Sequence, residues 1–209
     1  MKIVVITDDH LKEELLAQGL DDAADVEWVH DINTISKNAE VYIDLLFESN
    51  RDNRKEILSQ LPADVIIIND TIGTSENLPA NFTRINGWPT FLKRNITEAS
   101  CNNEAIKEKA EETLSLFNKK TEWTQDISGF ITARVVSMII NEAFFSLQDN
   151  VSSREEIDTA MKLGTNYPYG PFEWSRLIGV QKIYSLLLTL SKTNARYTPC
   201  DLLKKELAF

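Results

Sequence analysis

Two carboxylates and a histidine follow the first apolar run of the chain. Residues 2–6 read Lys-Ile-Val-Val-Ile, and Thr7, Asp8, Asp9 and His10 come next. A short β-branched run of this kind predicts a buried strand. In a dinucleotide-binding unit, such a strand leads into a glycine-rich loop whose backbone approaches a diphosphate at a helix N-terminus. Here the two carboxylates would repel a diphosphate.

Asp8 and Asp9 have a second interpretation, which requires no ligand. The first glycine after the strand is Gly19, so the glycine fingerprint of a dinucleotide site is missing. Aspartate is a preferred N-cap residue and stabilises the first turn of a helix. We therefore favour an N-cap and first-turn pair for the helix that follows.

Other reactive side chains are few. His10 and His30 are the only histidines, and we favour a surface position over a catalytic role for both. Cys101 and Cys200 are too few for a disulfide framework or a zinc site. A reducing compartment fits this cysteine usage, and the N-terminal apolar run is too short for a signal peptide. We expect a cytoplasmic protein without a metal site.

The charge of the chain limits its partners. It carries 22 Lys and Arg against 32 Asp and Glu, a net charge of −10. This balance argues against nucleic acid or an anionic membrane surface, although a local basic patch could still bind phosphate. The longest apolar stretch, residues 130–147, contains Arg134, Asn141 and Glu142. Such residues are costly in a bilayer, so the stretch predicts a buried helix and no membrane span.

The first half of the chain alternates between strand and helix patterns. Strands are predicted at residues 2–6, 40–47 and 63–68, with a short one at 26–29 and weaker extended segments at 85–88 and 96–99. Helices are predicted at residues 10–18, 51–61 and 104–117. This alternation is typical of a parallel α/β sheet. Ile106, Ala110, Leu114 and Phe117 share one face of the last helix, which we expect to cover the sheet.

The second half contains helical patterns alone, beginning at Gly129. Ser153 and Glu156 have capping-box spacing and open a helix that is predicted to end at Leu163. Gly164 is expected to follow it as the left-handed residue. Two further helices, 172–178 and 201–207, are expected to have Pro171 and Pro199 at their first positions.

These patterns predict two domains. Residues 1–122 are expected to form a Rossmann-like parallel sheet domain without the glycine fingerprint. Residues 123–209 are expected to form an all-helical domain.

Four segments near the start and middle of the second half stand in a distinctive order. They read Asp126-Ile-Ser-Gly-Phe-Ile-Thr-Ala-Arg134, Asn141-Glu-Ala143, Glu156-Ile-Asp-Thr-Ala-Met-Lys-Leu-Gly164 and Tyr167-Pro-Tyr-Gly-Pro-Phe-Glu173. This order and spacing resemble the C-terminal domain of the 3-hydroxyacyl-CoA dehydrogenases, including 3-hydroxybutyryl-CoA dehydrogenases. The resemblance continues through residues 196–199. It extends weakly to the first half, where residues 39–48 resemble the family strand before the catalytic serine loop.

The chain departs from the family pattern in the first half. The family is usually longer, and the part that is missing here lies between the second and third strand candidates, where its members carry a helical arm. The resemblance implies hydride transfer between C3 of a 3-hydroxyacyl-CoA and NAD, with a histidine as the base. It also implies a glutamate that orients the histidine, and a serine and an asparagine that hold the reacting oxygen.

The positions implied by this resemblance have mostly changed residue type. Glu98 stands at the glutamate position, and the spacing then puts Asn86 at the histidine position. Asparagine cannot serve as that base. The family's asparagine before arginine becomes Ala133, and Ile72 lies at or near the serine position. Whether the chain is an enzyme is therefore left open, and NAD is implied by the resemblance only.

Candidate site residues follow from the same comparison. Glu98 is a candidate catalytic remnant, although pairing with Arg94 or Lys93 at the surface is the interpretation we favour for it. Asn86, Thr71 and Arg134 are candidates for substrate binding. Residues 167–171 are expected to shape a turn and pack helices, because Pro and Gly fix backbone geometry.

Three functions remain open. The first is a catalytically degenerate family member in fatty-acid or hydroxyacyl-CoA metabolism that binds an acyl-CoA or serves as a dimerising partner. The second is a working NAD-dependent oxidoreductase with a rearranged site, and the third is an interaction module that binds no cofactor. A homodimer through the helical domain is also expected, because the helix at 129–148 has apolar residues around its whole axis.

Overall fold

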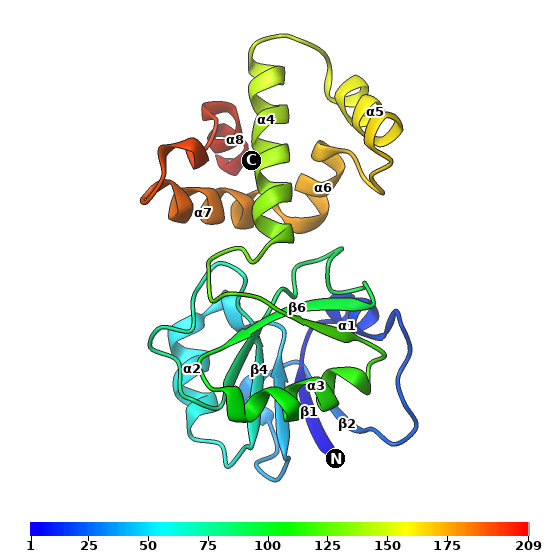
Figure 1. Ribbon diagram of the computed structural model, residues 1–209, viewed down its shortest axis with the longest axis vertical. Coiled ribbons are helices and arrows are strands. Elements are labelled where there is room, and N and C mark those ends of the chain that lie inside the picture. The colour runs from blue at the N-terminus through cyan, green and yellow to red at the C-terminus, as the bar shows by residue number, and fades with distance from the viewer. Residues whose placement is uncertain (209) are drawn as a thin grey trace. The chain divides into compact units, whose positions relative to one another are not determined.

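A computed structural model describes residues 1–208. The chain divides into two compact units, Met1–Phe130 and a second that begins at Ile131. The first is an α/β sheet with helices and the second is entirely helical (Figure 1). The fold class predicted from the sequence is therefore confirmed.

The first unit is built on a seven-stranded sheet with the order β2-β1-β3-β4-β5-β6-β7. The strands are β1 (Lys2–Ile6), β2 (Asp25–Val29), β3 (Val41–Asp44), β4 (Val65–Asn69), β5 (Phe82–Ile85), β6 (Ile96–Cys101) and β7 (Lys120–Trp123). Every pairing is parallel except that of β5 with β6. The last strand was not foreseen in the sequence.

One predicted strand is misplaced. Residues 85–88 were expected to be extended, but β5 ends at Ile85. Asn86 makes one further backbone bond, from its N–H to the carbonyl of Glu98. At Gly87 the chain leaves the ladder, because the Gly87 N–H donates to the side-chain oxygen of Asn69 instead.

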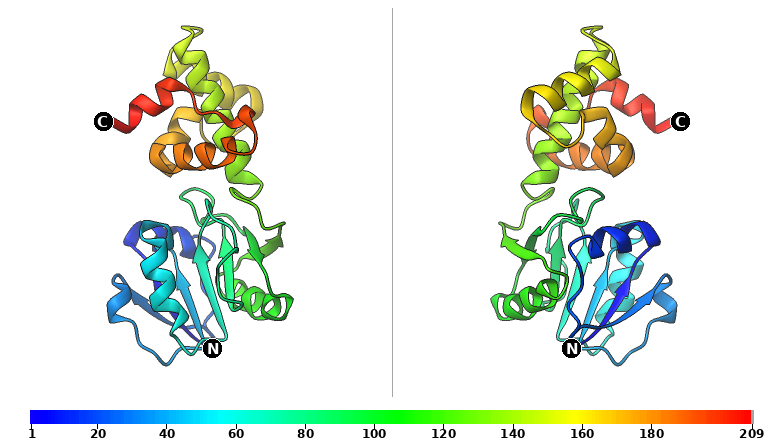
Figure 2. Two further views of the ribbon diagram at one scale, coloured as in Figure 1. Left: turned by 90° about the vertical axis from the view of Figure 1, so that its left-hand side faces the viewer. Right: turned by 90° about the vertical axis from the view of Figure 1, so that its right-hand side faces the viewer.

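Three helices cover the sheet: α1 (Asp9–Leu16), α2 (Arg51–Ser59) and α3 (Lys107–Ser115). Alternate side chains of β1 point to opposite faces of the sheet and contact different helices. Ile3 and Val5 pack in one core with α1 and α3, whereas Val4 and Ile6 pack in another with α2. In Figure 2, α2 and α3 lie on opposite sides of the strands. The sheet is thus buried on both faces, as its continuous Val and Ile runs predicted.

Local sequence features account for the helix boundaries in this unit. Asp8 is the N-cap of α1 and accepts a hydrogen bond from the Leu11 N–H at 2.8 Å. The N-cap interpretation of Asp8 is confirmed. The helix predicted at 104–117 begins as a 3₁₀ turn, Glu104–Ile106, and its four predicted face residues are all buried in the core.

The second unit contains α4 (Thr132–Gln148), α5 (Arg154–Thr165), α6 (Pro171–Ile178), α7 (Val180–Ser191) and α8 (Asp201–Lys205). In Figure 1, α4 runs through its middle, with α7 and α8 on one side and α5 and α6 on the other. Ser153 and Glu156 form the predicted capping box, and Pro171 is the first residue of α6. Among residues 1–208, no helix has the length and apolarity needed to cross a membrane.

Two predicted helix ends in this unit are wrong. Gly164 lies inside α5, and the left-handed residue after the helix is Asn166, with φ of 57°. Asparagine tolerates this conformation, so the helix continues past the glycine. Pro199 precedes the N-cap of α8, Cys200, and is not its first helical residue.

Candidate functional site

In open parallel sheets, ligands bind in the crevice outside the carboxyl ends of the strands, where the strand order reverses. In this sheet the order reverses between β1 and β3. The chain segments after β1, β3, β4 and β5 therefore define the edge at which a site is expected. This edge carries a connected set of buried polar side chains.

The centre of this set joins three residues chosen from the sequence. The Asn86 side-chain N–H donates to the Glu98 carboxylate at 2.8 Å. The Thr71 hydroxyl lies 3.3 Å from Asn86 Oδ1 and 3.4 Å from Asn69 Oδ1. All four residues are buried. The Asn86–Glu98 contact is short and involves a charged acceptor, whereas the two contacts of Thr71 are long and weak.

Glu98 differs from the surface residue that we favoured. Its exposed fraction is 5%, because β6 lies between β5 and β7 and carries it inward. Arg94 remains a charge neighbour of Glu98. Burial lowers the pKa of the Arg94 guanidinium, and the charge of Glu98 opposes that shift.

Asn69, at the end of β4, fixes the backbone around this centre. Its amide N–H groups donate to the carbonyls of Leu45 and Gly87, each at 3.1 Å. Its oxygen accepts from the Gly87 N–H at 3.1 Å. A Cβ atom at position 87 would lie 2.7 Å from Asn69 Cγ, so only glycine permits this close approach. Asn69 thereby ties together the segments after β3, β4 and β5.

Glu48 is a site residue that the sequence analysis missed. It follows β3, and its Oε1 accepts from the N–H groups of Thr71 at 2.8 Å and Ile72 at 3.1 Å. Its Oε2 accepts from the Trp88 indole at 2.9 Å. Nothing local in the sequence indicates this role, because the donors lie 23 to 40 residues further along the chain. Ile72, at the predicted serine position, takes part through its backbone.

A second charged cluster, centred on Arg84 and Asp126, binds the backbone of the segment after β4. The fully buried Arg84 side chain donates to Asp126 and to the carbonyls of Asp70 and Gly73. Burial lowers the pKa of Arg84, and the charges of Asp70 and then Asp126 oppose this. Asp126 also accepts from the Ser75 N–H at 2.8 Å. These bonds fix the backbone on which Thr71 lies.

The end of β3 carries a buried ion pair that the sequence did not reveal. Asp44 is fully buried and receives two hydrogen bonds from Arg54 of α2, at 2.7 and 2.8 Å. Burial raises the pKa of Asp44, and the hydrogen bonds and charge of Arg54 counteract this. The pair anchors α2 to the sheet edge.

The two histidines lie on the surface, as favoured. His10 is 3.9 Å from Glu14, and His30 is 3.8 Å from Asp9. Their side chains are 59% and 70% exposed. Within residues 1–208, no group of three or more His, Cys, Asp or Glu side chains is placed to hold a metal ion.

Arg134, the fourth candidate, lies in the helical unit on α4. Its guanidinium stands over the Tyr197 ring, 5.5 Å from the ring centre. The structure thus brings together Glu98, Asn86 and Thr71 within the sheet unit, and Arg134 contacts Tyr197 within the helical unit.

The turn before α6 shows why its motif has this composition. Asp158 of α5 accepts from the Phe172 N–H at 2.7 Å and the Glu173 N–H at 3.2 Å. A Cβ at Gly170 would lie 2.4 Å from the Asp158 Cβ, so glycine is required there. Tyr167 and Tyr169 both pack on the Trp174 ring. The predicted turn-forming and packing role of residues 167–171 is confirmed.

Comparisons with known proteins agree with this architecture. The family model described as "3-hydroxyacyl-CoA dehydrogenase, C-terminal domain" matches residues 129–208. A 3-hydroxybutyryl-CoA dehydrogenase of Bradyrhizobium diazoefficiens is 28% identical over 207 residues, 93% of this chain and 67% of the relative. The chain is thus similar to the 3-hydroxyacyl-CoA dehydrogenases, by the family model over residues 129–208 and at lower identity over most of its length. The similarity predicted from its motifs is thereby confirmed.

Two other proteins with related names match a smaller part of the chain or its fold. The 3-hydroxyadipyl-CoA dehydrogenase of Escherichia coli is 42% identical over 113 residues, which are 53% of this chain but only 24% of that relative. The structure of (S)-3-hydroxybutyryl-CoA dehydrogenase from Ralstonia eutropha aligns with a TM-score of 0.76, over 99% of this chain and 93% of that one. At 19% identity, this last likeness establishes the fold alone.

Proposed function

We propose that this chain is a member of the 3-hydroxyacyl-CoA dehydrogenase family that binds an acyl-CoA thioester without catalysing the family's hydride transfer. The observation that carries the proposal is the Asn86–Glu98 hydrogen bond of 2.8 Å. By the resemblance, a histidine paired with a glutamate would stand there as the base. A carboxamide nitrogen donates hydrogen bonds but does not take up a proton, so Asn86 cannot serve as the general base that the resemblance implies at this position.

The same residues retain hydrogen-bonding capacity toward a carbonyl group. The Asn86 amide has two N–H donors, and one is engaged with Glu98. The Thr71 hydroxyl makes only contacts of 3.3 and 3.4 Å, which a better acceptor could replace. Together these groups suit the oxygen of a thioester or 3-keto group. This is the basis for proposing an acyl-CoA ligand.

The residues after β1 do not fit NAD. The Asp8 carboxylate occupies the N-terminal end of α1 by accepting from the Leu11 N–H, where a diphosphate would bind. Asp9 adds a second negative charge, and its carboxylate is 89% exposed. Both features oppose a dinucleotide. The loop after β1 therefore does not suit the diphosphate of NAD.

The decisive experiment combines an activity assay with a binding measurement. We expect purified protein to bind acetoacetyl-CoA in isothermal titration calorimetry and to leave NADH unoxidised in its presence. Turnover of about 10 per second, the median for enzymes, would instead establish a working oxidoreductase. Asn86→His alone is expected to leave the protein inactive, since the residues after β1 still disfavour the cofactor.

A matched pair of threonine variants tests the proposed contact. Thr71→Val removes the hydroxyl next to Asn86, and we expect an affinity for acetoacetyl-CoA that is about two- to tenfold lower. Thr83→Val removes a buried hydroxyl of β5 that has no hydrogen-bond partner and should leave the affinity unchanged. Absence of acetoacetyl-CoA binding in the wild-type protein would favour the cofactor-free interaction module.

We also propose a cytoplasmic homodimer that associates through the helical unit. Ile131 and Val135, which lie one turn apart at the start of α4, are 56% and 51% exposed. Light scattering should give twice the chain mass for the wild type and the single mass for Val135→Glu. Phe144 is unsuitable for this test, because it is fully buried against Phe172. A single mass for the wild type at micromolar concentration would contradict the dimer.

A further inference from the structure

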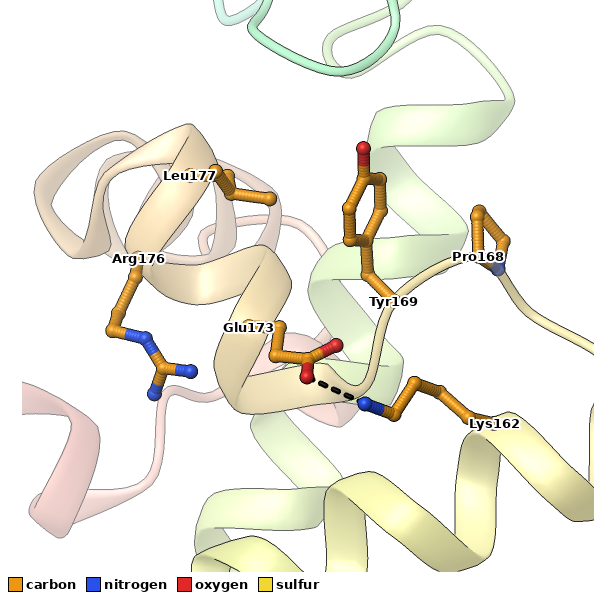
Figure 3. Close-up of a pocket in the computed structure, with 6 residues that line it drawn as sticks. All are labelled: Lys162, Pro168, Tyr169, Glu173, Arg176 and Leu177. Carbon is orange, nitrogen blue, oxygen red and sulfur yellow. Dashed lines mark hydrogen bonds and ion pairs between the residues drawn. The ribbon is translucent and has the colours of Figure 1, made fainter.

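A surface depression of about 450 Å³, largely open to solvent, lies beside the turn that opens α6. It is lined by Lys162 of α5, Pro168 and Tyr169 of the turn, and Glu173, Arg176 and Leu177 of α6 (Figure 3). We call it the Arg176 pocket. Its volume lies within the range of small-molecule sites in proteins.

The walls of the Arg176 pocket are fixed by bonds within the helical unit. Glu173 accepts from the Gly170 N–H at 2.9 Å and from Lys162 at 2.5 Å. Asp158 holds the first N–H groups of α6, and Gly170 leaves no room for a side chain. A ligand would therefore meet a preformed surface, which reduces the entropy lost on binding.

Of the two cations that line the pocket, Lys162 is paired with Glu173, and Arg176 is available to bind an anionic ligand. The hydrogen bond from Lys162 and then that from the Gly170 N–H lower the pKa of Glu173, and the charge of Arg176 contributes least. Glu173 is thus an anion already bound by Lys162. Within the part of the chain that the structure describes, the Arg176 guanidinium donates no hydrogen bond to a protein acceptor, and the residue is exposed. Its planar donor fork matches a carboxylate.

The rest of the lining is apolar. Pro168, the ring of Tyr169 and Leu177 form it, and Leu177 is 41% exposed although it is a large aliphatic residue. We propose that the Arg176 pocket binds a small organic carboxylate with a hydrocarbon body. The carboxylate pairs with Arg176 and the hydrocarbon covers Tyr169 and Leu177. This site lies wholly in the helical unit and does not depend on the proposed acyl-CoA function.

Calorimetric titration of the full chain with acetate, butyrate, hexanoate and octanoate tests the proposal. Each methylene that enters the pocket should tighten binding about three- to fourfold, until the pocket is filled. Arg176→Gln should weaken octanoate binding at least about tenfold, because a charge-assisted bidentate contact is lost. The matched control is Lys192→Gln, which removes an exposed cation of the same unit at the end of α7 and should have no effect.

Two further measurements locate the bound ligand and check that the variant is folded. In ¹⁵N NMR spectra, octanoate should shift the amide signals of Gly170 and Leu177 in the wild type. Equal circular dichroism spectra of Arg176→Gln and wild type would show that folding is intact. Three results would overturn the proposal. They are octanoate binding that does not saturate, octanoate binding that is unchanged in Arg176→Gln, and binding of inorganic phosphate with the same affinity as octanoate. Binding of acetoacetyl-CoA is measured in a separate titration, so failure of octanoate binding and failure of acyl-CoA binding can be told apart.

Discussion

The sheet edge and the turn before α6 both place carboxylates against backbone N–H groups, but over different distances along the chain. At the edge, Glu48 receives donors that lie up to 40 residues away, and Asn86 meets Glu98 across two strands. At the turn, Asp158 accepts from the Phe172 N–H and Glu173 accepts from the Gly170 N–H, so all the partners lie within 15 residues of one another. Asp158 can approach this closely because Gly170 has no Cβ. The family model matches the helical unit, where the motif residues are needed for the turn itself.

This contrast shows how a fold and its chemistry can separate. A glycine that has no room for a Cβ cannot change without disturbing the helix. At position 86, asparagine keeps a hydrogen bond to Glu98 of the neighbouring strand but takes up no proton. Variants that disturb each region should therefore differ in what they alter.

The largest effect is expected at the buried ion pair of the sheet edge. Arg54→Met leaves Asp44 without its partner and should lower the free energy of unfolding by about 3–5 kcal/mol at pH 7. The pKa of Asp44 is already raised by burial, so its ionisation destabilises the folded chain as pH rises above the unfolded value of about 4. The cost of the substitution should thus shrink as pH falls toward 4. Urea unfolding between pH 4 and 7 measures this.

The turn before α6 should show the next largest effect. Gly170→Ala forces a methyl group against Asp158 and should cost about 2–3 kcal/mol in thermal unfolding followed by calorimetry. Gly164→Ala is the matched control, since a Cβ there meets open space inside α5. That substitution should stabilise the chain by about 0.5–1 kcal/mol. Equal effects of the two would contradict the packing account of Gly170.

Glu48 tests whether distant contacts position the sheet edge. Glu48→Ala frees the N–H groups of Thr71 and Ile72 and the Trp88 indole, and should cost about 1–2 kcal/mol. Affinity for acetoacetyl-CoA should fall with it, whereas Glu76→Ala, an exposed substitution in the loop after β4 that also carries Thr71 and Ile72, should change neither quantity. If affinity stays constant in Glu48→Ala, Glu48 supports the fold but not the site.

The smallest effect concerns Lys119, which holds the segment after Trp88. Its ammonium donates to the carbonyls of Leu92 and Arg94, and burial lowers its pKa to about 8. The unfolded chain, with a lysine pKa of about 10.4, holds this proton longer, so stability should rise between pH 8 and 10. Relative to Lys119→Met, the gain should be about 1 kcal/mol per pH unit at most. A pH-independent difference would show that Lys119 stays charged.

Sequence patterns were sufficient to predict the sheet class, the two-part architecture, the Asp8 and Ser153 caps and the turn before α6. These follow from hydrophobic periodicity and from contacts between residues close in the chain, which a single segment encodes. Helix ends were less secure, because Asn166 serves as well as Gly164 for a left-handed residue. The strand β7 escaped detection because it is half-exposed and polar, with Lys, Thr and Glu in its four residues.

The surroundings of the site, in contrast, depend on tertiary packing. The resemblance placed Asn86 and Glu98 at related positions, but their contact, the burial of Glu98 and the part played by Glu48 depend on which strands lie side by side. The pairs Asp44–Arg54 and Arg84–Asp126 likewise form between segments that have no common pattern in the sequence. A buried charge finds its partner through the packing of distant elements, and the sequence of either element alone does not contain that information.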